Sequence, residues 1–265
     1  MQINALPALF YRGSDAIFAA LQSERPYNAP HLPEPTVVFE DNHLLVLDKP
    51  AGMPVQGDES GDLCLVDWAK AYLVAKYQKP GEAFVGLVHR LDRPVGGLVM
   101  LAKTSKALAR LNAAVADRSI TKRYLARTEH MPDAPSGVLE DYLLKNAANN
   151  TSRRVSPKHK QGKRAVLGYQ VFATDGQAAL LGVDLQTGRH HQIRVQLASR
   201  GWAIVGDVKY GARQHYSPQA IQLHASYLRM AHPVGGAILE LYSAPPWSEN
   251  SSEMLKKLGE WLPTL

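Results

Sequence analysis

Residues 89–97, HRLDRPVGG, place a single carboxylate, Asp92, between two arginines in a segment that also carries proline and paired glycines. Short apolar and partly β-branched runs lie on both sides, at 84–88 and 98–102. Such runs are typical of buried strands. Because proline and glycine interrupt regular structure, we expect the acid on a loop between two strands. The stretch therefore predicts a sheet with a carboxylate at one of its strand connections.

The two arginines, Arg90 and Arg93, give this loop a distinct chemical character. A neighbouring guanidinium favours the ionised form of a carboxylate, and guanidinium groups also bind phosphate. An ionised carboxylate on a rigid loop suits nucleophilic chemistry on an anionic substrate. From the charges alone, however, a surface ion-pair network without catalytic function is the stronger interpretation.

Strand and helix signals continue outward from this loop in both directions. Strands are expected at 36–40, 43–48, 121–127, 138–144, 165–173, 178–185, 221–230 and 237–242. Helices are expected from residue 62, at 105–116, at 190–200 and from residue 251. Runs of strands with interspersed helices favour the α+β class, with a mixed, mainly antiparallel sheet and flanking helices.

Two parts of unequal size are expected along the chain. Residues 1–35 are proline-rich at both ends and predict an N-terminal extension with one short helix around Ile17, Phe18 and Leu21. Residues 36–265 predict one large domain, since no glycine- or serine-rich linker interrupts them.

The composition excludes several classes of protein. With 45% hydrophobic and 20% charged residues, the chain of 265 residues is expected to be globular. No run of 18 apolar residues and no signal-peptide pattern is present, and the single cysteine, Cys64, fits a reducing compartment. We therefore expect a cytoplasmic protein that does not associate with membranes. Metal-ligand spacings, a phosphate-binding loop and a nucleophile elbow are missing from the sequence, so no metal or nucleotide cofactor is expected.

Positive charge is concentrated in one segment of a chain whose net charge is +6. Between Tyr142 and Thr174 there is no acidic residue, and polar residues suggest an exposed loop. The basic residues there are Lys145, Arg153, Arg154, Lys158, Lys160, Lys163 and Arg164. Contact with phosphates and a merely solvated loop are about equally good interpretations of this segment.

Two further clusters combine basic and aromatic side chains. Residues 187–194, TGRHHQIR, lead into a helix whose buried face leaves Arg194 at its edge, where a partly buried arginine could reach a carboxylate. Residues 122–126, KRYLA, place Tyr124 among cations on a strand, where it can stack on a base. Taken alone, a solvated helix start and an ordinary packed tyrosine are the better interpretations.

Taken together, six motifs resemble those of the RluA-type pseudouridine synthases, enzymes that isomerise uridine in RNA to its C-glycoside. The motifs are LDKPAGMPV (47–55), HRLDRPVGGLVMLAKT (89–104), KRYLA (122–126), TGRHHQIRV (187–195), GDVKYG (206–211) and LHASYL (223–228). The resemblance covers about residues 37–246. It implies the pseudouridine synthase fold with a central catalytic cleft, ribosomal or transfer RNA as substrate, and no cofactor or metal. It also implies a monomer that needs no protein partner.

The resemblance assigns roles to individual residues. The family's catalytic aspartate falls on Asp92, the tyrosine that stacks on the target base on Tyr124, and the basic residue that pairs with the aspartate on Arg194. The arginine that fills the gap left by a flipped nucleotide falls on Arg90. Further RNA contacts are expected from Arg93, Lys163, Arg164 and Arg189.

The chain departs from the family in places that bear on these roles. Pro94–Gly97 replaces a turn that usually carries a serine or threonine hydroxyl, and Gln196 stands where many relatives have histidine. The 35 residues before the domain are too few for the separate RNA-binding domain of many relatives. The alternatives are a catalytically silent RNA-binding or RNA-folding protein on the same fold and a glycosidic-bond hydrolase. The hydrolase is disfavoured because no paired general acid is evident.

Overall fold

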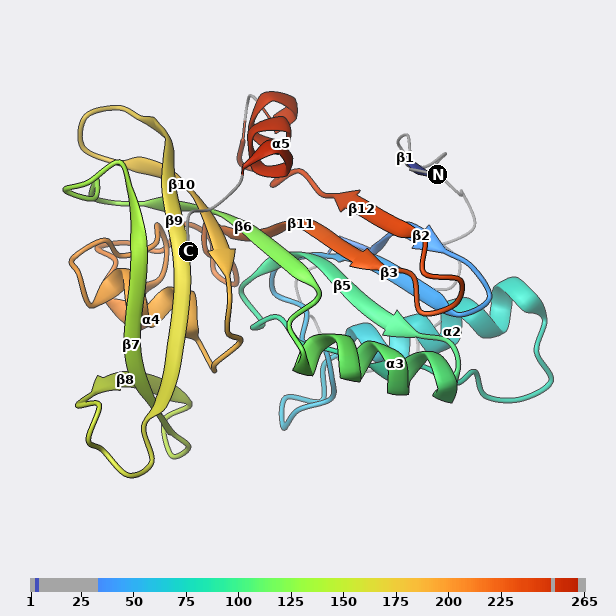
Figure 1. Ribbon diagram of the computed structural model, residues 1–265. Coiled ribbons are helices and arrows are strands. Elements are labelled where there is room, and N and C mark those ends of the chain that lie inside the picture. The colour runs from blue at the N-terminus through green and yellow to red at the C-terminus, as the bar shows by residue number, and fades with distance from the viewer. Residues whose placement is uncertain (1–2, 5–32, 249–250, 262–265) are drawn as a thin grey trace. The chain divides into compact units, whose positions relative to one another are not determined.

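The computed structural model describes residues 3–4, 33–248 and 251–261 (Figure 1). The short helix expected around Ile17 lies outside these residues, and so do residues 262–265, which follow the helix expected from residue 251. The boundary proposed at residue 36 therefore stays a prediction.

The chain divides into two compact units. The first consists of Met1–Ile120 with Arg229–Leu241, and the second of Thr121–Leu228 with Tyr242–Leu265. Asp92 therefore belongs to the first unit, and both Tyr124 and Arg194 belong to the second. The chain passes back from the second unit to the first within a single strand, β11, which spans Leu223–Ala231.

The first unit is built on antiparallel strands, as the sequence predicts. β3 pairs antiparallel with both β2 and β5, and β4 pairs antiparallel with β5. A parallel pairing of β1 with β12 makes the sheet mixed. The bounds are β1 Ile3–Asn4, β2 Thr36–Glu40, β3 Leu44–Lys49, β4 Gly86–Leu87, β5 Gly96–Ala102 and β12 Ile238–Tyr242.

The core of this unit lies around β3 and β5. All seven residues of β5 are buried, and Leu44–Leu47 of β3 are fully buried, which explains why both sequences are continuous apolar runs. Two helices, α2 (Leu65–Tyr77) and α3 (Ser105–Ala116), cover one side of these strands (Figure 1). The helical spacing of the sequence places Leu65, Trp68, Ala69, Tyr72 and Leu73 on one face, and these are the five residues of α2 that are buried. The Thr104 hydroxyl accepts from the amide of Ala107 at 3.2 Å and caps α3 at the predicted start.

The second unit has a sheet of antiparallel strands in the order β6-β10-β9-β7-β8. The bounds are β6 Thr121–Thr128, β7 Ser136–Asn146, β8 Thr151–Val155, β9 Lys163–Thr174 and β10 Ala179–Leu185. A short helix, α4 (Gln192–Ala198), contacts β7 and β8 (Figure 1). The helix α5 (Ser251–Glu260) packs Met254 and Leu258 against Leu125 of β6 and Tyr227 of β11.

The prediction of an exposed loop between Lys145 and Arg164 was wrong in part, because residues 151–155 form a strand and residues 147–150 and 156–162 are the connections around it. β7 continues to Asn146, β8 follows after a short turn, and β9 begins at Lys163. Threonine, valine and tyrosine favour strands, and an edge hairpin can carry arginines on its solvent side without burying them. Most of the basic residues therefore lie on strands, whereas Lys158 and Lys160 lie on the connection between β8 and β9.

The helices differ from the prediction mainly in length. The helix expected at 190–200 is one of only seven residues, Gln192–Ala198. It begins late because His191 has φ 54°, a left-handed conformation that is incompatible with an α-helix. No helix in the described part of the chain has both the length and the apolar character needed to cross a bilayer.

Candidate active site

Asp92 lies in the first unit on the connection between β4 and β5, where the sequence predicts it. Its neighbours Leu91 and Val95 are buried, and the amide of Val95 donates to the carbonyl of Asp92 at 3.0 Å. Asp92 itself is partly buried. Gly97 follows at φ 112°, a conformation that favours glycine. Buried anchors and a closed turn therefore fix the backbone that carries the carboxylate.

Lys49 joins this loop to the end of β3. Its side chain is fully buried. Its ammonium donates to the carbonyl oxygens of Met53 at 2.8 Å, Pro50 at 2.9 Å and Arg93 at 3.3 Å. The amide of Gly52 donates to the same Arg93 carbonyl at 2.8 Å. Residues 50–53 are therefore tied to the residue that follows the acid.

The charge of Lys49 depends on both its burial and its neighbours. Burial lowers the pKa of Lys49 to about 7, against the opposing attraction of the carboxylates of Asp92 and Asp48. The sequence prediction gave this lysine no role. The available signal was its place at the end of an apolar strand, directly before a proline, in the motif LDKPAGMPV.

The arginines that flank the acid have different surroundings. Arg93 forms an ion pair with Asp62, and its Nη1 donates to the hydroxyl of Ser60 at 3.1 Å. Arg90 is exposed, with its Nη1 3.4 Å from the side-chain oxygen of Gln56. Arg93 thus orders the loop that contains Ser60, whereas Arg90 extends toward solvent. Their contacts with RNA stay predictions.

Tyr124 and Arg194 are both buried side chains of the second unit, 6% and 4% exposed. Tyr124 lies on β6, in register with Val183 of β10. Arg194 lies on α4, and its Nε and Nη2 donate to the two carboxylate oxygens of Asp207 at 2.7 and 2.8 Å. The ring of Tyr210 lies 4.9 Å from the guanidinium carbon of Arg194. A bidentate pair and an aromatic face therefore set the orientation of this arginine.

His191 extends this cluster but is not suited to proton transfer near neutral pH. Its Nδ1 lies 2.7 Å from the hydroxyl of Tyr210, and its ring stacks on that of His190 at 3.7 Å. Burial, together with the positive charge of Arg194, lowers the pKa of His191 to about 2. The imidazole is therefore neutral and supports Tyr210 through a hydrogen bond.

The remaining predicted RNA-binding residues gather at the start of β9. Arg164 forms a bidentate pair with Glu140, at 2.7 and 2.8 Å, on the exposed side of the sheet. The Nε of Arg189 donates to the carbonyl of Arg164 at 3.0 Å, and Lys163 is exposed. Among the residues that the structure describes, no three His, Cys, Asp or Glu side chains are grouped so as to hold a metal ion.

Each unit therefore organises one part of the predicted chemistry. The first unit combines the Asp92 loop with Lys49, and the second combines Arg194 with Asp207 and Tyr210. The roles of Asp207 and Tyr210 were not predicted, although both belong to the motif GDVKYG. Because these contacts join residues that are separated in the sequence, they can be identified only from the structure.

Comparison with known proteins gives a consistent result. The model of the family described as RNA pseudouridylate synthase matches residues 43–199. Ribosomal large subunit pseudouridine synthase D of Zymomonas mobilis is 34% identical over 251 residues, which are 91% of this chain and 78% of that protein. Ribosomal large subunit pseudouridine synthase C of Vibrio cholerae is 31% identical, over 86% of this chain and 70% of that protein.

The fold also matches solved structures. The structure titled Human RNA Pseudouridylate Synthase Domain Containing 4 has a TM-score of 0.68 and 24% sequence identity, and the match covers 97% of this chain and all of that one. Human RNA Pseudouridylate Synthase Domain Containing 1 gives a TM-score of 0.67 at 20% identity, over 90% of this chain. At these identities the likeness establishes the architecture, which is the one that the sequence predicts.

Proposed function

This chain belongs to the RNA pseudouridylate synthase family, and from that premise we propose that it converts uridine to pseudouridine in ribosomal large-subunit RNA. Relatives that share about a third of its residues over most of its length carry this substrate in their names. The observation that supports the proposal most strongly is that the matched region, 43–199, includes Asp92, Tyr124 and Arg194. Retention of all three disfavours a catalytically silent RNA-binding protein.

In the reaction, uracil and the ribose first separate with opposite charges and then rejoin through a different atom of uracil. The bond between uracil N1 and the anomeric carbon breaks, and a bond from uracil C5 to that carbon forms. The proton on C5 leaves and N1 gains one, so that no water is consumed. Bond breakage leaves positive charge on the ribose and negative charge on uracil, as in glycoside cleavage.

Asp92 is proposed as the carboxylate that attacks or stabilises the ribose. A catalytic carboxylate must keep its position while the sugar and the base separate, because small displacements reduce rates strongly. The turn closed by Val95 and the carbonyl contacts of Lys49 supply this rigidity. Lys49 is therefore a positioning residue in this proposal.

Tyr124 is proposed to hold the target base, and Arg194 is proposed to supply a positive charge at the site. A tyrosine ring can stack on a uracil that has been flipped out of the RNA and can keep it in place during its rotation. Arg194 supplies a fixed positive charge, since the Asp207 pair and the ring of Tyr210 limit its freedom. Arg90, exposed on the Asp92 loop, is proposed to fill the gap left by the flipped nucleotide.

The test uses unmodified RNA transcripts and the purified chain. Large-subunit ribosomal RNA and a transfer RNA mixture are incubated separately, and pseudouridine is mapped as carbodiimide-resistant adducts. We expect new adducts at defined positions of the ribosomal transcript. Adducts confined to transfer RNA would contradict the proposed substrate, and adducts in neither RNA would favour the silent RNA-binding protein. Release of free uracil would indicate a hydrolase.

A further inference from the structure

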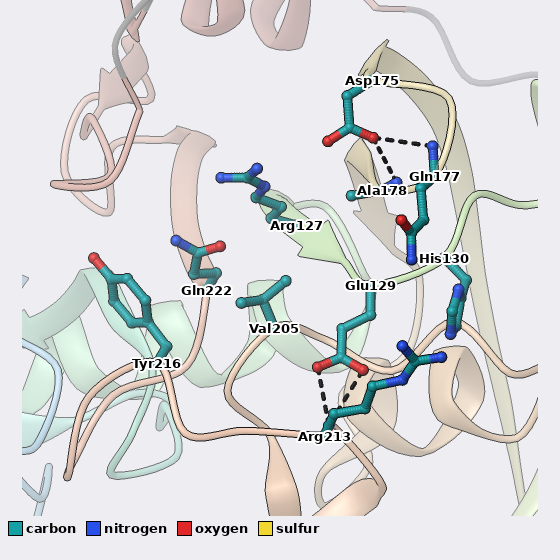
Figure 2. Close-up of a pocket in the computed structure, with 10 residues that line it drawn as sticks. All are labelled: Arg127, Glu129, His130, Asp175, Gln177, Ala178, Val205, Arg213, Tyr216 and Gln222. Atoms are coloured by element: carbon teal, nitrogen blue, oxygen red, sulfur yellow. Dashed lines mark hydrogen bonds between the residues drawn. The ribbon is translucent and has the colours of Figure 1, made fainter.

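A cavity of about 460 Å³ lies in the second unit at the C-terminal end of β6 (Figure 2). Its walls come from the end of β6, from the turn between β9 and β10, and from the segment 205–222. The volume is within the range of small-ligand sites. None of the residues proposed above for the reaction lines this cavity.

The cavity lies on the face of β6 opposite to Tyr124. Successive side chains of a strand point to opposite faces, and β6 pairs with β10 without a register shift from Arg123 to Thr128. Arg127, which lines the cavity, therefore shares a face with Leu125, whose side chain packs against α5. Tyr124 points to the other face, so the cavity is a separate feature.

Backbone hydrogen bonds make the floor of the cavity rigid. The amide of Arg127 donates to the carbonyl of Gln222, and the amide of Gln222 donates to the carbonyl of Val205. The amide of Val205 in turn donates to the carbonyl of Arg127. Each of these three bonds is 2.9 Å long. The residues that converge on the cavity are thus held by a closed set of main-chain contacts.

Gln222 carries an unsatisfied polar atom in this wall. Its side chain is 4% exposed, and its Oε1 has no hydrogen-bond partner within the described part of the chain. Figure 2 shows the amide of Gln222 pointing into the cavity between Arg127 and Tyr216. A buried carbonyl oxygen without a partner is costly, so a ligand that donates a hydrogen bond to it would stabilise this wall.

The two carboxylates of the cavity are already engaged. The oxygens of Glu129 accept from the amide of Arg213 at 3.0 and 3.2 Å, and one oxygen of Asp175 accepts from the amides of Gln177 and Ala178 (Figure 2). These backbone bonds, with a further contribution from Arg127, hold the pKa of Asp175 below its ordinary value.

The guanidinium groups, by contrast, are available to a ligand. Arg127 and Arg213 both line the cavity and are exposed. Within the part of the chain that the structure describes, neither guanidinium forms an ion pair. Figure 2 shows the Arg127 guanidinium on the side of Gln222 and Tyr216, whereas that of Arg213 points toward the side of His130. Arg127 is therefore the group placed to hold a phosphate beside Gln222 and Tyr216.

An aromatic ring completes the site. Tyr216 lines the cavity with 44% of its surface exposed. Its backbone is set by Gly206, which has φ 87° and where an added Cβ would lie 2.6 Å from the Cβ of Tyr216. Only glycine allows this close approach, so the position of Tyr216 is built into the fold.

We propose that this cavity binds one unpaired ribonucleotide of the RNA substrate, with the base on Tyr216 and Gln222 and the phosphate on Arg127. An amide can both donate to and accept from the edge of a base, a tyrosine ring stacks on its face, and a guanidinium group holds the phosphate. The choice of RNA over a free nucleotide rests on the proposed function. The site would anchor RNA beyond the target uridine.

Fluorescence anisotropy of a labelled short oligouridine, titrated with the full chain, tests this proposal without requiring turnover. Tyr216→Ala should weaken binding at least about fivefold, the lower range of the loss expected when stacking is removed. Tyr216→Phe keeps the ring and should bind as the wild type does. Lys256→Gln, which removes an exposed cation from α5 of the same unit, is the charge control and should have no effect.

The dependence of binding on salt separates the two halves of the site. Arg127→Gln should reduce the slope of log affinity against log salt by about 0.7, the value for one phosphate contact on a single strand. Tyr216→Ala should leave that slope unchanged. Gln222→Leu keeps the volume of the buried side chain and should weaken binding without altering the slope.

Three outcomes would overturn the proposal. Unchanged oligouridine affinity in both Tyr216→Ala and Arg127→Gln would show that the cavity does not contact RNA. An equal effect of Lys256→Gln would show general electrostatic attraction. Uridine monophosphate that binds the wild type and not Tyr216→Ala, with oligouridine binding unchanged, would assign the cavity to a free nucleotide. A chain that binds oligouridine as proposed but forms no pseudouridine would refute the proposed function alone.

Discussion

Replacing Asp207 with asparagine tests how Arg194 is held. The Arg194 and Asp207 side chains are 5% and 1% exposed, so their pair is almost fully removed from water. Removing one charge from a buried pair costs about 3–5 kcal/mol, because the remaining charge is left uncompensated. Asparagine keeps one acceptor oxygen for the guanidinium, so we expect a loss near the lower end of this range. For a chain of this size, the melting temperature should fall by roughly 6–12 °C.

The assay combines thermal unfolding with single-turnover pseudouridine formation. Asp207→Asn should reduce turnover at least about tenfold, since the bidentate contact that orients Arg194 is lost. Asp184→Asn is the matched control. Asp184 pairs with Arg123 at 3.1 Å in the same unit, with side chains 4% and 8% exposed. This control should lose similar stability and keep its turnover when assayed below its melting temperature.

Two results would refute this reasoning. If Asp207→Asn and Asp184→Asn lowered turnover equally, the loss would reflect general destabilisation of the second unit. If Asp207→Asn kept full turnover, the orientation of Arg194 would not matter to the reaction.

Three further predictions follow from individual contacts. Burial raises the pKa of Glu40, but hydrogen bonds from four side chains outweigh it and lower the pKa from 4.5 to about 2; the donors are Lys103, Lys76, Tyr77 and Tyr72. Glu40→Gln should therefore reduce the free energy of unfolding by about 3 kcal/mol at neutral pH. This stabilisation is complete above pH 4.5 and should disappear as the pH falls toward 2, which denaturant titrations at several pH values will show. Because burial lowers the pKa of His191 from 6.5 to about 2, only the unfolded state gains this proton below pH 6.5; His191→Asn should therefore remove an acid-side slope of about 1.4 kcal/mol per pH unit. Lys49→Met should lower turnover at least about tenfold while RNA affinity changes little, and equal losses in both would count against a positioning role.

The sequence predicted the elements whose pattern is local. A strand buried on both faces, such as β3 or β5, gives a continuous apolar run, and a helix buried on one face, such as α2, gives a periodic apolar pattern. These elements could therefore be recognised from the sequence. The loop that carries Asp92 was found for the same reason, since proline and glycine mark the end of a strand. The segment around β8 was missed because its polar composition is shared by loops and by solvent-exposed hairpins.

The supporting residues of the site could not be predicted in this way. Lys49 reaches the carbonyl of Arg93 across 44 positions of the chain, and Arg194 reaches Asp207 across 13. Such contacts depend on tertiary placement, which neither periodicity nor composition encodes. The resemblance to a family pointed to the reacting residues, whereas the structure shows what holds them in place.

Asp92→Asn tests the central claim most directly, by measuring single-turnover pseudouridine formation in large-subunit ribosomal RNA alongside RNA affinity. The variant keeps the shape of the side chain and removes the negative charge. We expect pseudouridine formation to fall by at least about 100-fold, the scale of losing one charge-stabilising group in an active site, while the chain binds RNA as tightly as before. Pseudouridine formation at the wild-type rate by Asp92→Asn would contradict the account.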